Sequence, residues 1–369
     1  MPWPFHPARV TTVRLLVNFV YCHPLGHAIE ALHYAHGYHV ANPDARISVA
    51  LNAATPVELA SLCPFVEEVY PVPVDVFDGD ATFDLSGLPR DFDHYVNDVR
   101  GFLPDQRAIF PGLGAYYDAA KAHFTGEFGI AGHNGPAYAA AQHLRLAVTP
   151  IPRAGHPRVA LLPGGSADRS LYPSVRSWEL IIAALTGRFP DAEFVLVGKL
   201  AADGRTATTY TAAELAAIRA AMPRSRSVVD APLVEQLATV AACDVLVSPH
   251  SGFGMAALAV GTPWLTIAGN RWPEYYFTGV PFYSVLPDIT RFPCYTTMGP
   301  DPDPVDDDGP RSPSMSYERV TGDLPEIVDG AAKLIERRWP YRDALVDHVS
   351  RMSIVGGVRW SIDDAHVLP

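Results

Sequence analysis

The chain has 369 residues, of which 48% are hydrophobic and 18% are charged. This length and apolar content predict two domains with sizeable cores and exclude a disordered chain or a coiled coil. The net charge of −12 argues against a nucleic-acid or anionic-membrane binder, because such proteins depend on basic clusters. The four cysteines form no CxxC pair, so the sequence shows no zinc signature and favours a reducing, cytoplasmic location.

The first 70 residues alternate between strand-like and helix-like segments. Residues 11–20 predict a strand, 26–38 a helix, 46–51 a second strand and 65–69 a third. Such an alternation is typical of a parallel sheet with helical crossovers. Residues 71–110 are rich in Pro, Asp and Gly and give no clear pattern.

A second alternation begins at Arg158, after a proline-rich segment at 149–157 that marks the expected domain boundary. Trp178, Ile181, Ile182 and Leu185 have the spacing of one apolar helix face. We therefore expect an α/β protein with two doubly wound Rossmann-like domains, 1–152 and 153–339. We expect the C-terminal segment 340–369 to be helical and to pack back on the first domain.

Two features of the C-terminal third predict loops and helix starts. Residues 288–322 contain five aspartates between Asp301 and Asp308, and we interpret them as a solvated loop and not as a cation site. Asp323 and Glu326 flank a Leu-Pro pair that predicts the start of the next helix.

Four expected strand ends in the second domain carry small or polar residues, and open α/β sheets bind ligands at this edge. The segment after residue 249 passes into a helix, whose first N–H groups suit a diphosphate. Four such segments on one sheet edge favour a ligand site over plain turns. They contain Gly164, Gly165 and Ser166; Gly198 and Lys199; His250, Ser251, Gly252, Phe253 and Gly254; and Glu274.

Several segments resemble the bacterial ADP-heptose:lipopolysaccharide heptosyltransferase family, which has a GT-B fold. Residues 233–269 read LVEQLATVAACDVLVSPHSGFGMAALAVGTPWLTIAG, similar to the donor-site segment of that family. Residues 163–166 (PGGS) and Gly198 also match, and Arg176-Ser-Trp178 stands where the family usually has Lys-x-Trp. Residues 15–50 resemble the family's opening strand, loop, helix and second strand.

The resemblance implies two domains facing a central cleft and an inverting transfer of a sugar from a nucleotide-diphosphate donor, without metal or other cofactor. The departing diphosphate needs charge stabilisation, which Arg176, Lys199 and the amides of 251–253 can supply. His250 is placed to contact ribose or phosphate, and Glu274 to accept from a sugar hydroxyl.

One departure from the family concerns the catalytic base. The family has Asp after Gly in the first loop, whereas this chain has Gly26-His27. A neutral imidazole can take the proton of an acceptor hydroxyl, and a Gly-His in this loop supplies the base in UDP-dependent glycosyltransferases that act on small molecules. His27 is therefore the predicted base, the alternative being a binding or packing role. Five histidines fall within residues 23–39, but no Cys or acid pairs with them at ligand spacing, so we expect no metal site.

The charge distribution bears on the acceptor. Residues 1–150 carry eight basic and 15 acidic residues, a net charge of −7, which would repel a polyanionic lipopolysaccharide core. A neutral or cationic small molecule fits better, possible contacts being Tyr21, His23 and Gly26. Because only three of the 28 basic residues are Lys and 35 residues are Pro, typical of a GC-rich genome, we favour an antibiotic precursor over a cell-envelope saccharide. Two alternatives stay open: a GT-B nucleotide-sugar epimerase, and a catalytically inactive GT-B binding protein.

Overall fold

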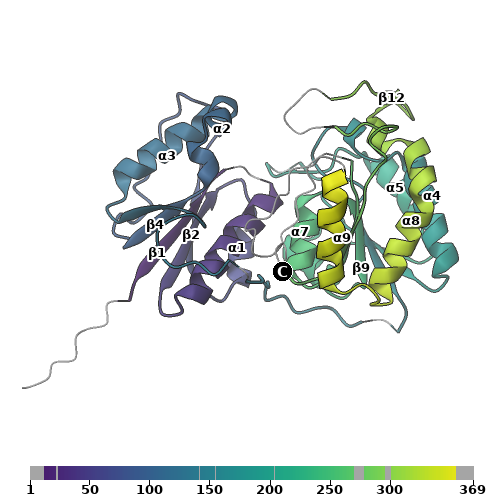
Figure 1. Ribbon diagram of the computed structural model, residues 1–369, viewed down its shortest axis with the longest axis horizontal. Helices are drawn as coiled ribbons and strands as arrows, with labels where there is room; N and C mark the ends of the chain where they lie inside the picture. The colour runs from purple at the N-terminus through teal and green to yellow at the C-terminus, as the bar shows by residue number, and fades with distance from the viewer. Residues whose placement is uncertain are drawn as a thin grey trace, which may run out of the picture. The chain divides into compact units, whose positions relative to one another are not determined.

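The computed structural model describes residues 12–21, 24–140, 142–153, 155–202, 204–269, 278–295 and 301–354. Contacts between residues divide the chain into two compact units, each built on its own parallel sheet (Figure 1). The first unit comprises 1–22 and 31–142, and the second comprises 23–30 and 143–369. The predicted boundary at 152/153 and the cleft between the domains stay predictions.

The first sheet has the strand order β3-β2-β1-β4-β5, and all four pairings are parallel. The chain moves from β1 outward to β3 and then returns to β4 on the other side of β1. Its elements are β1 (Arg14–Phe19), α1 (Leu25–Ala41), β2 (Arg46–Asn52), the 3₁₀ turn Val57–Leu62, β3 (Val66–Val72), β4 (His94–Asn97), the 3₁₀ turn Val99–Phe102, α2 (Pro104–Ile109), α3 (Pro111–His123) and β5 (Glu127–Ile130).

The second sheet has the order β11-β10-β9-β6-β7-β8 and is also parallel throughout. Its elements are β6 (Arg158–Leu161), α4 (Val175–Arg188), β7 (Glu193–Leu196), α5 (Ala212–Ala220), β8 (Ser225–Ser227), α6 (Leu233–Val240), β9 (Val245–Pro249), α7 (Gly252–Ala259), β10 (Trp264–Ile267) and β11 (Phe282–Val285). A two-stranded hairpin, β12 (Val305–Asp306) and β13 (Pro310–Arg311), and the helices α8 (Tyr317–Ile335) and α9 (Tyr341–Ile354) follow. The predicted pair of doubly wound sheets is confirmed.

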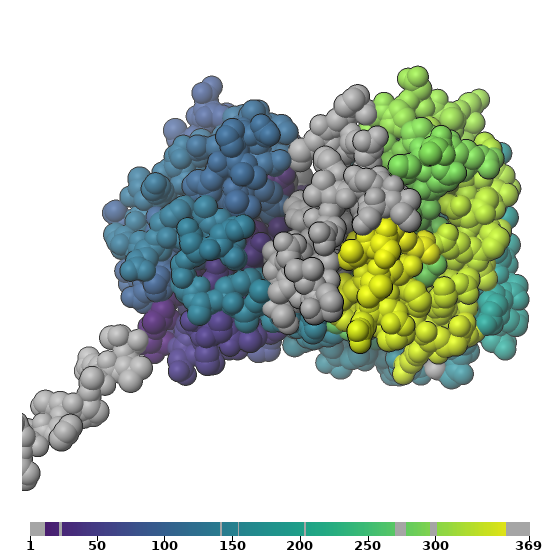
Figure 2. Space-filling model, in the orientation of Figure 1, coloured from purple at the N-terminus to yellow at the C-terminus, as the bar shows by residue number. Residues whose placement is uncertain are grey.

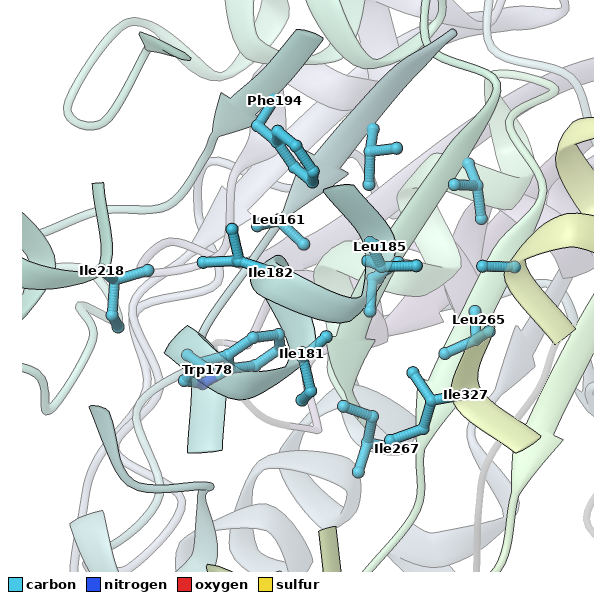
Figure 3. Packing of buried hydrophobic residues seen from close by; sticks show 14 of the residues in the cluster. Leu161, Trp178, Ile181, Ile182, Leu185, Phe194, Ile218, Leu265, Ile267 and Ile327 are labelled. Carbon is cyan, nitrogen blue, oxygen red and sulfur yellow. The ribbon is translucent and has the colours of Figure 1, made fainter. Parts of the chain in front are cut away.

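The core of the second unit forms where the predicted apolar face of α4 meets the sheet. Trp178, Ile181, Ile182 and Leu185 are fully buried, together with Leu161, Phe194 and Leu265 of the strands and Ile327 of α8 (Figure 3). Trp178 buries its ring without leaving a polar atom unpaired, because its Nε1–H donates to Tyr210 Oη at 2.9 Å. This core packs against the strands β6, β7 and β10 through Leu161, Phe194 and Leu265.

The structure differs from the sequence prediction at the start of α8. Ser316 caps this helix by accepting from Arg319 N, so the helix begins at Tyr317, six residues before Asp323, and Pro325 lies inside it. The predicted start at Asp323 was wrong because a proline can stand beyond the first turn when neighbouring contacts hold the helix. Those contacts come from Arg319, which is completely buried and donates to Asp323 Oδ2 and to Val285 O, both at 2.7 Å.

The C-terminal helix α9 contacts the second sheet in its described part. Arg351 of α9 pairs with Glu326 of α8 and donates to Tyr283 Oη at 2.9 Å, and His348 packs on Phe282 of β11. In Figure 2 the yellow surface of this helix is exposed to solvent on its outer side. The predicted return of 340–369 to the first domain stays a prediction.

Candidate functional site

The order of the second sheet creates a switch point between β6 and β9. From β6 the chain runs outward through β7 and β8, and it then crosses back to β9 and runs the other way. Leu161 at the end of β6 lies beside Val247 of β9 and Leu196 of β7. Three of the four predicted donor segments, at 164–166, 198–199 and 250–254, therefore follow adjacent strands at one sheet edge. Ligands of open α/β sheets bind at this position.

The turn after β6 owes its glycines to packing. A Cβ on Gly164 would lie 2.7 Å from the Tyr172 ring and 2.8 Å from the Tyr210 ring. Tyr172 Oη also accepts from Ala167 N at 3.0 Å, and Gly165 O accepts from Thr209 N at 3.0 Å. Two buried tyrosines thus fix the backbone of 164–167 in place, which explains the glycine at 164 whatever binds there.

The turn after β9 leads directly into α7. Ser251 caps the helix, its Oγ accepting from Gly254 N at 3.2 Å. The remaining amides of the first turn are the ones that a helix leaves for an external acceptor. A Cβ on Gly254 would lie 2.2 Å from the Trp264 ring, and the imidazole of His250 stacks on the same ring with centroids 5.9 Å apart. Trp264 thus positions both ends of the segment 250–254.

Gly198, at the end of β7, is held by a side chain that the sequence did not single out. Gln236 of α6 accepts from Gly198 N at 2.9 Å and donates to Gly198 O at 3.1 Å. Gly198 has φ +134°, a conformation that side chains rarely adopt. Lys199 follows it and is partly exposed, and its carbonyl accepts from Thr208 N.

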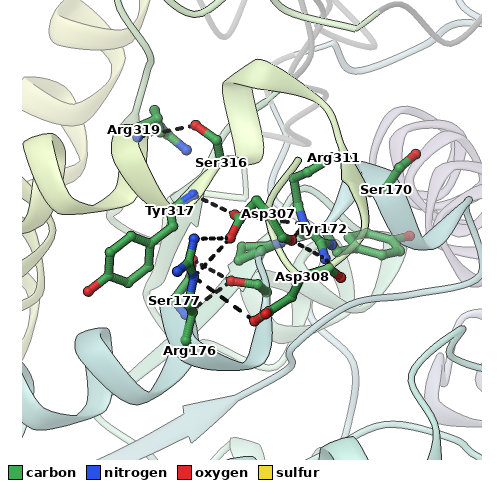
Figure 4. Close-up of polar contacts among 12 residues, drawn as sticks. Ser170, Tyr172, Arg176, Ser177, Asp307, Asp308, Arg311, Ser316, Tyr317 and Arg319 are labelled. Carbon is green, nitrogen blue, oxygen red and sulfur yellow. Dashed lines mark hydrogen bonds and ion pairs between the residues drawn. The ribbon is translucent and has the colours of Figure 1, made fainter. Parts of the chain in front are cut away.

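Arg176 lies in the first turn of α4, where it is paired with a carboxylate from the hairpin. Its Nε and Nη2 donate to Asp307 Oδ1 at 2.9 and 2.6 Å, and its guanidinium lies 4.2 Å from the centroid of the Tyr317 ring (Figure 4). The hydrogen bond to Asp307 raises the pKa of Arg176. The Arg176 side chain remains 48% exposed, so a ligand can reach the guanidinium. Its positive charge is already compensated by the carboxylate of Asp307.

Asp307 corrects the interpretation of the aspartate-rich loop as simply solvated. Four of the five aspartates between 301 and 308 are exposed, but Asp307 is buried and also accepts from Tyr317 N at 2.7 Å. Arg311 of β13 is buried as well and donates to the carbonyls of Arg169 and Tyr172 at 2.8 and 2.6 Å. Burial lowers the pKa of Arg311. The hairpin is therefore tied to the loop between β6 and α4.

The first turn of α1 belongs by its contacts to the second unit. Within that unit, a Cβ on Gly26 would lie 3.1 Å from Gly252 Cα, so the start of α1 meets the start of α7. His27 is the next residue, and its Nδ1 lies 3.4 Å from Oε2 of the buried Glu30. The predicted base therefore follows Gly26, whose backbone lies against Gly252 of the predicted diphosphate segment. Glu30 places a carboxylate beside the imidazole of His27.

The remaining predicted residues are placed differently or lie outside the described residues. Tyr21 belongs to the first unit, where its ring packs beneath the Arg100 guanidinium at 4.0 Å. His23 and Glu274 lie outside the described residues. Among the residues that the structure describes, no group of three or more His, Cys, Asp or Glu could hold a metal ion, and no helix is long and apolar enough to cross a membrane.

Four supporting residues could not be found from sequence motifs: Glu30, Gln236, Asp307 and Arg311. Gln236, Asp307 and Arg311 act through contacts between segments far apart in sequence; Arg176 and Asp307, for example, are 131 positions apart. Only Glu30 carried a local signal, since a residue three positions after His27 in a helix lies on the same face.

Compared by sequence, the chain matches no protein-family model and no curated protein. Solved structures match over most of its length. The E. coli heptosyltransferase WaaC with ADP has 13% identity and a TM-score of 0.53, covering 87% of this chain and 99% of that one. E. coli ADP-heptose lps heptosyltransferase II has 14% identity and a TM-score of 0.51, covering 86% and 98%.

A glycosyl transferase family 9 protein from Veillonella parvula gives 13% identity and a TM-score of 0.52, with 86% of this chain and 97% of that chain covered. At these identities the likeness concerns the fold. The predicted resemblance and fold class are both confirmed: the chain has a GT-B-like fold and is distantly similar in structure to the GT-B heptosyltransferases over most of its length.

Proposed function

We propose that the protein is an inverting glycosyltransferase that moves a sugar from a nucleotide-diphosphate donor to a hydroxyl of a small-molecule acceptor. The observation that carries this proposal is the alignment of three predicted donor segments at the switch point of the second sheet. The distant structural similarity to heptosyltransferases, one of them solved with ADP, supports the donor class.

In the proposed reaction the acceptor oxygen attacks the anomeric carbon as the bond from that carbon to the diphosphate oxygen breaks. His27 Nε2 takes the acceptor proton, and Glu30 accepts the Nδ1–H, which orients the ring and stabilises the imidazolium that forms. The amides that open α7 and the exposed face of Arg176 offset the charge on the departing diphosphate.

The acceptor that we propose is neutral or cationic, such as an antibiotic precursor, because the first 150 residues carry a net charge of −7. An epimerase would convert the donor without any acceptor, so product analysis with the donor alone separates that alternative. An inactive binding protein would bind the donor without turnover, and His27→Ala would then change nothing, whereas an enzyme should lose about 10²–10⁴-fold in kcat with donor affinity kept.

A thermal-shift panel with ADP, GDP, UDP and dTDP tests the donor site. At about 100 times Kd a ligand that binds the folded protein stabilises it by about 2.7 kcal/mol, which raises Tm by several degrees. We expect one diphosphate to do so, and Arg176→Ala to lose the shift. Arg188→Ala is the matched control, because Arg188 lies on the same helix and also pairs with a carboxylate, Glu336. If no diphosphate raises Tm, the proposed donor class is wrong.

A further inference from the structure

The hairpin β12–β13 places a buried carboxylate against the cation predicted for the donor site. Asp307 follows β12, and its side chain is only 3% exposed. Arg176 donates to Asp307 Oδ1 from both Nε and Nη2, at 2.9 and 2.6 Å (Figure 4). The chain reaches Arg176, in the first turn of α4, from the carboxyl end of β6. The ion pair therefore belongs to the edge at which open α/β sheets bind ligands.

The second oxygen of Asp307 is held by the start of α8 and lies near another arginine. Oδ2 accepts from Tyr317 N, the first amide of α8, at 2.7 Å and lies 3.9 Å from Arg311 Nε. Guanidinium groups and the first amides of a helix are the groups with which proteins bind phosphate. A carboxylate of the chain itself thus occupies a position that is built for an anion.

Direct contacts connect this position to the glycine turn after β6. Arg311 donates to Tyr172 O at 2.6 Å, and Ser312 N donates to Ser170 O at 2.9 Å. The Tyr172 ring in turn lies against Gly164, where an added Cβ would be 2.7 Å from it. The hairpin that carries Asp307 is therefore joined to the first of the predicted donor segments.

The two members of the ion pair differ in their access to solvent. The Asp307 side chain is buried, whereas the Arg176 side chain is 48% exposed. An anion from solution can therefore reach the guanidinium but not the opposite side of the carboxylate. Because Asp307 already compensates the charge of Arg176, such an anion is attracted less strongly than it would be by a free guanidinium.

We propose that Asp307 sets the affinity of the donor site by competing with the diphosphate for Arg176, which favours release of the product. This inference rests on the proposed function, in which Arg176 meets the diphosphate. When the bond from the anomeric carbon to the diphosphate oxygen breaks, that oxygen keeps the electron pair. The nucleoside diphosphate product therefore carries one negative charge more than the donor. An uncompensated Arg176 would hold this product more tightly than the donor, and Asp307 weakens that attraction.

Calorimetric titration of ADP, GDP, UDP and dTDP into the native full chain and into Asp307→Asn tests this competition. Asn removes the charge, keeps the size and can still accept from Tyr317 N. We expect the diphosphate that binds the native protein to bind Asp307→Asn about fivefold more tightly, the effect of one partly exposed ion pair. Asp308→Asn is the matched control, because Asp308 is exposed and lies 4.0 Å from Arg176 Nε. It should change the affinity by less than about twofold.

The direction of the change separates competition from a purely structural role. If Asp307 only held the hairpin and α8 in place, its replacement would weaken diphosphate binding or leave it unchanged. Adding Arg176→Ala to Asp307→Asn should abolish the gain, because the competition requires the guanidinium. A second readout uses the native protein and so does not depend on the folding of a variant. The Nε–H signal of Arg176, assigned by its absence in Arg176→Ala, should shift when the diphosphate is added, since that group donates to Asp307.

The outcomes distinguish failure of this inference from failure of the proposed function. If a diphosphate binds the native protein but binds Asp307→Asn no more tightly, or leaves the Arg176 Nε–H signal unmoved, the inference is overturned and the donor class stands. Binding by Asp307→Asn alone would show that Asp307 excludes the anion completely, which supports the competition. If neither protein binds any diphosphate, the proposed donor class has failed and this inference fails with it.

Discussion

Gln236 gives the most direct test of how the fold holds Gly198 at the carboxyl end of β7. Replacing it with Leu keeps about the same volume but removes three hydrogen bonds: one from Gly198 N, and one each to the carbonyls of Gly198 and Ala231. Gly198 O keeps a second donor, Asp230 N, so the main cost comes from the amide of Gly198 and from the Ala231 carbonyl. An unpaired buried polar group costs about 1–3 kcal/mol. Because Gly198 and Ala231 are only partly buried, we expect the lower part of the summed range, a loss of about 2–4 kcal/mol.

The assay is urea unfolding followed by tryptophan fluorescence, since Trp178 and Trp264 are fully buried in the second unit. Glu235→Leu is the matched control because this neighbour on α6 is exposed, and its substitution should change stability by less than about 0.5 kcal/mol. On the proposed donor site, the Gln236 variant should also weaken the binding of a nucleoside diphosphate by loosening Gly198. A loss below about 1 kcal/mol would refute the reasoning, because Gly198 would then be held by its strand alone.

Three further predictions concern the base, the pH dependence and the helix start. Glu30→Gln should move neutral His27 from the Nδ1–H toward the Nε2–H tautomer, measured by its ¹⁵N shifts; a pattern unchanged from the native protein would contradict the role of Glu30. Burial lowers the pKa of His348 from 6.5 to about 4, so folding gains stability above pH 6.5 that is lost as pH falls toward 4. His348→Leu should remove about 3 kcal/mol of this acid sensitivity in urea titrations run at several pH values, and parallel pH profiles would refute it. Gly254→Ala should cost about 1–3 kcal/mol because its methyl group would overlap the Trp264 ring; an unchanged Tm would show that the ring can move.

Much of the fold could be predicted because its signals are local. The apolar face of α4 follows from four residues within two turns, and all four are buried. The capping box at Thr211 and Glu214 marks the start of α5 in the same way, since both reciprocal hydrogen bonds form within four residues. Glycines that follow a strand-like run indicate a turn. On this basis the segments 164–166 and 198–199 were predicted to follow strands, and they follow β6 and β7.

The reasons for individual residues were harder to predict, because they depend on partners far away in sequence. Gly254 was interpreted as part of a phosphate-binding helix start, yet the ring of Trp264 on the neighbouring strand already requires a glycine there. The segment 71–110 has no periodic pattern because β4 is only four residues long, and its neighbour α2 has six. Neither length is enough to establish a period.

Arg176 and Asp307 show how the two kinds of information combine. The sequence analysis predicted that Arg176 stabilises a departing diphosphate. The structure pairs this cation with the buried carboxylate of Asp307, which also accepts from the start of α8. A diphosphate at this edge would therefore compete with Asp307 for the guanidinium. Asp307 also accepts from Tyr317 N at the start of α8, and Arg311 binds its hairpin to the loop after β6. A diphosphate that displaced Asp307 would therefore also change the contacts of α8 and of the hairpin. If the proposed donor binds at this edge, its binding and the position of the hairpin would therefore be coupled through the ion pair.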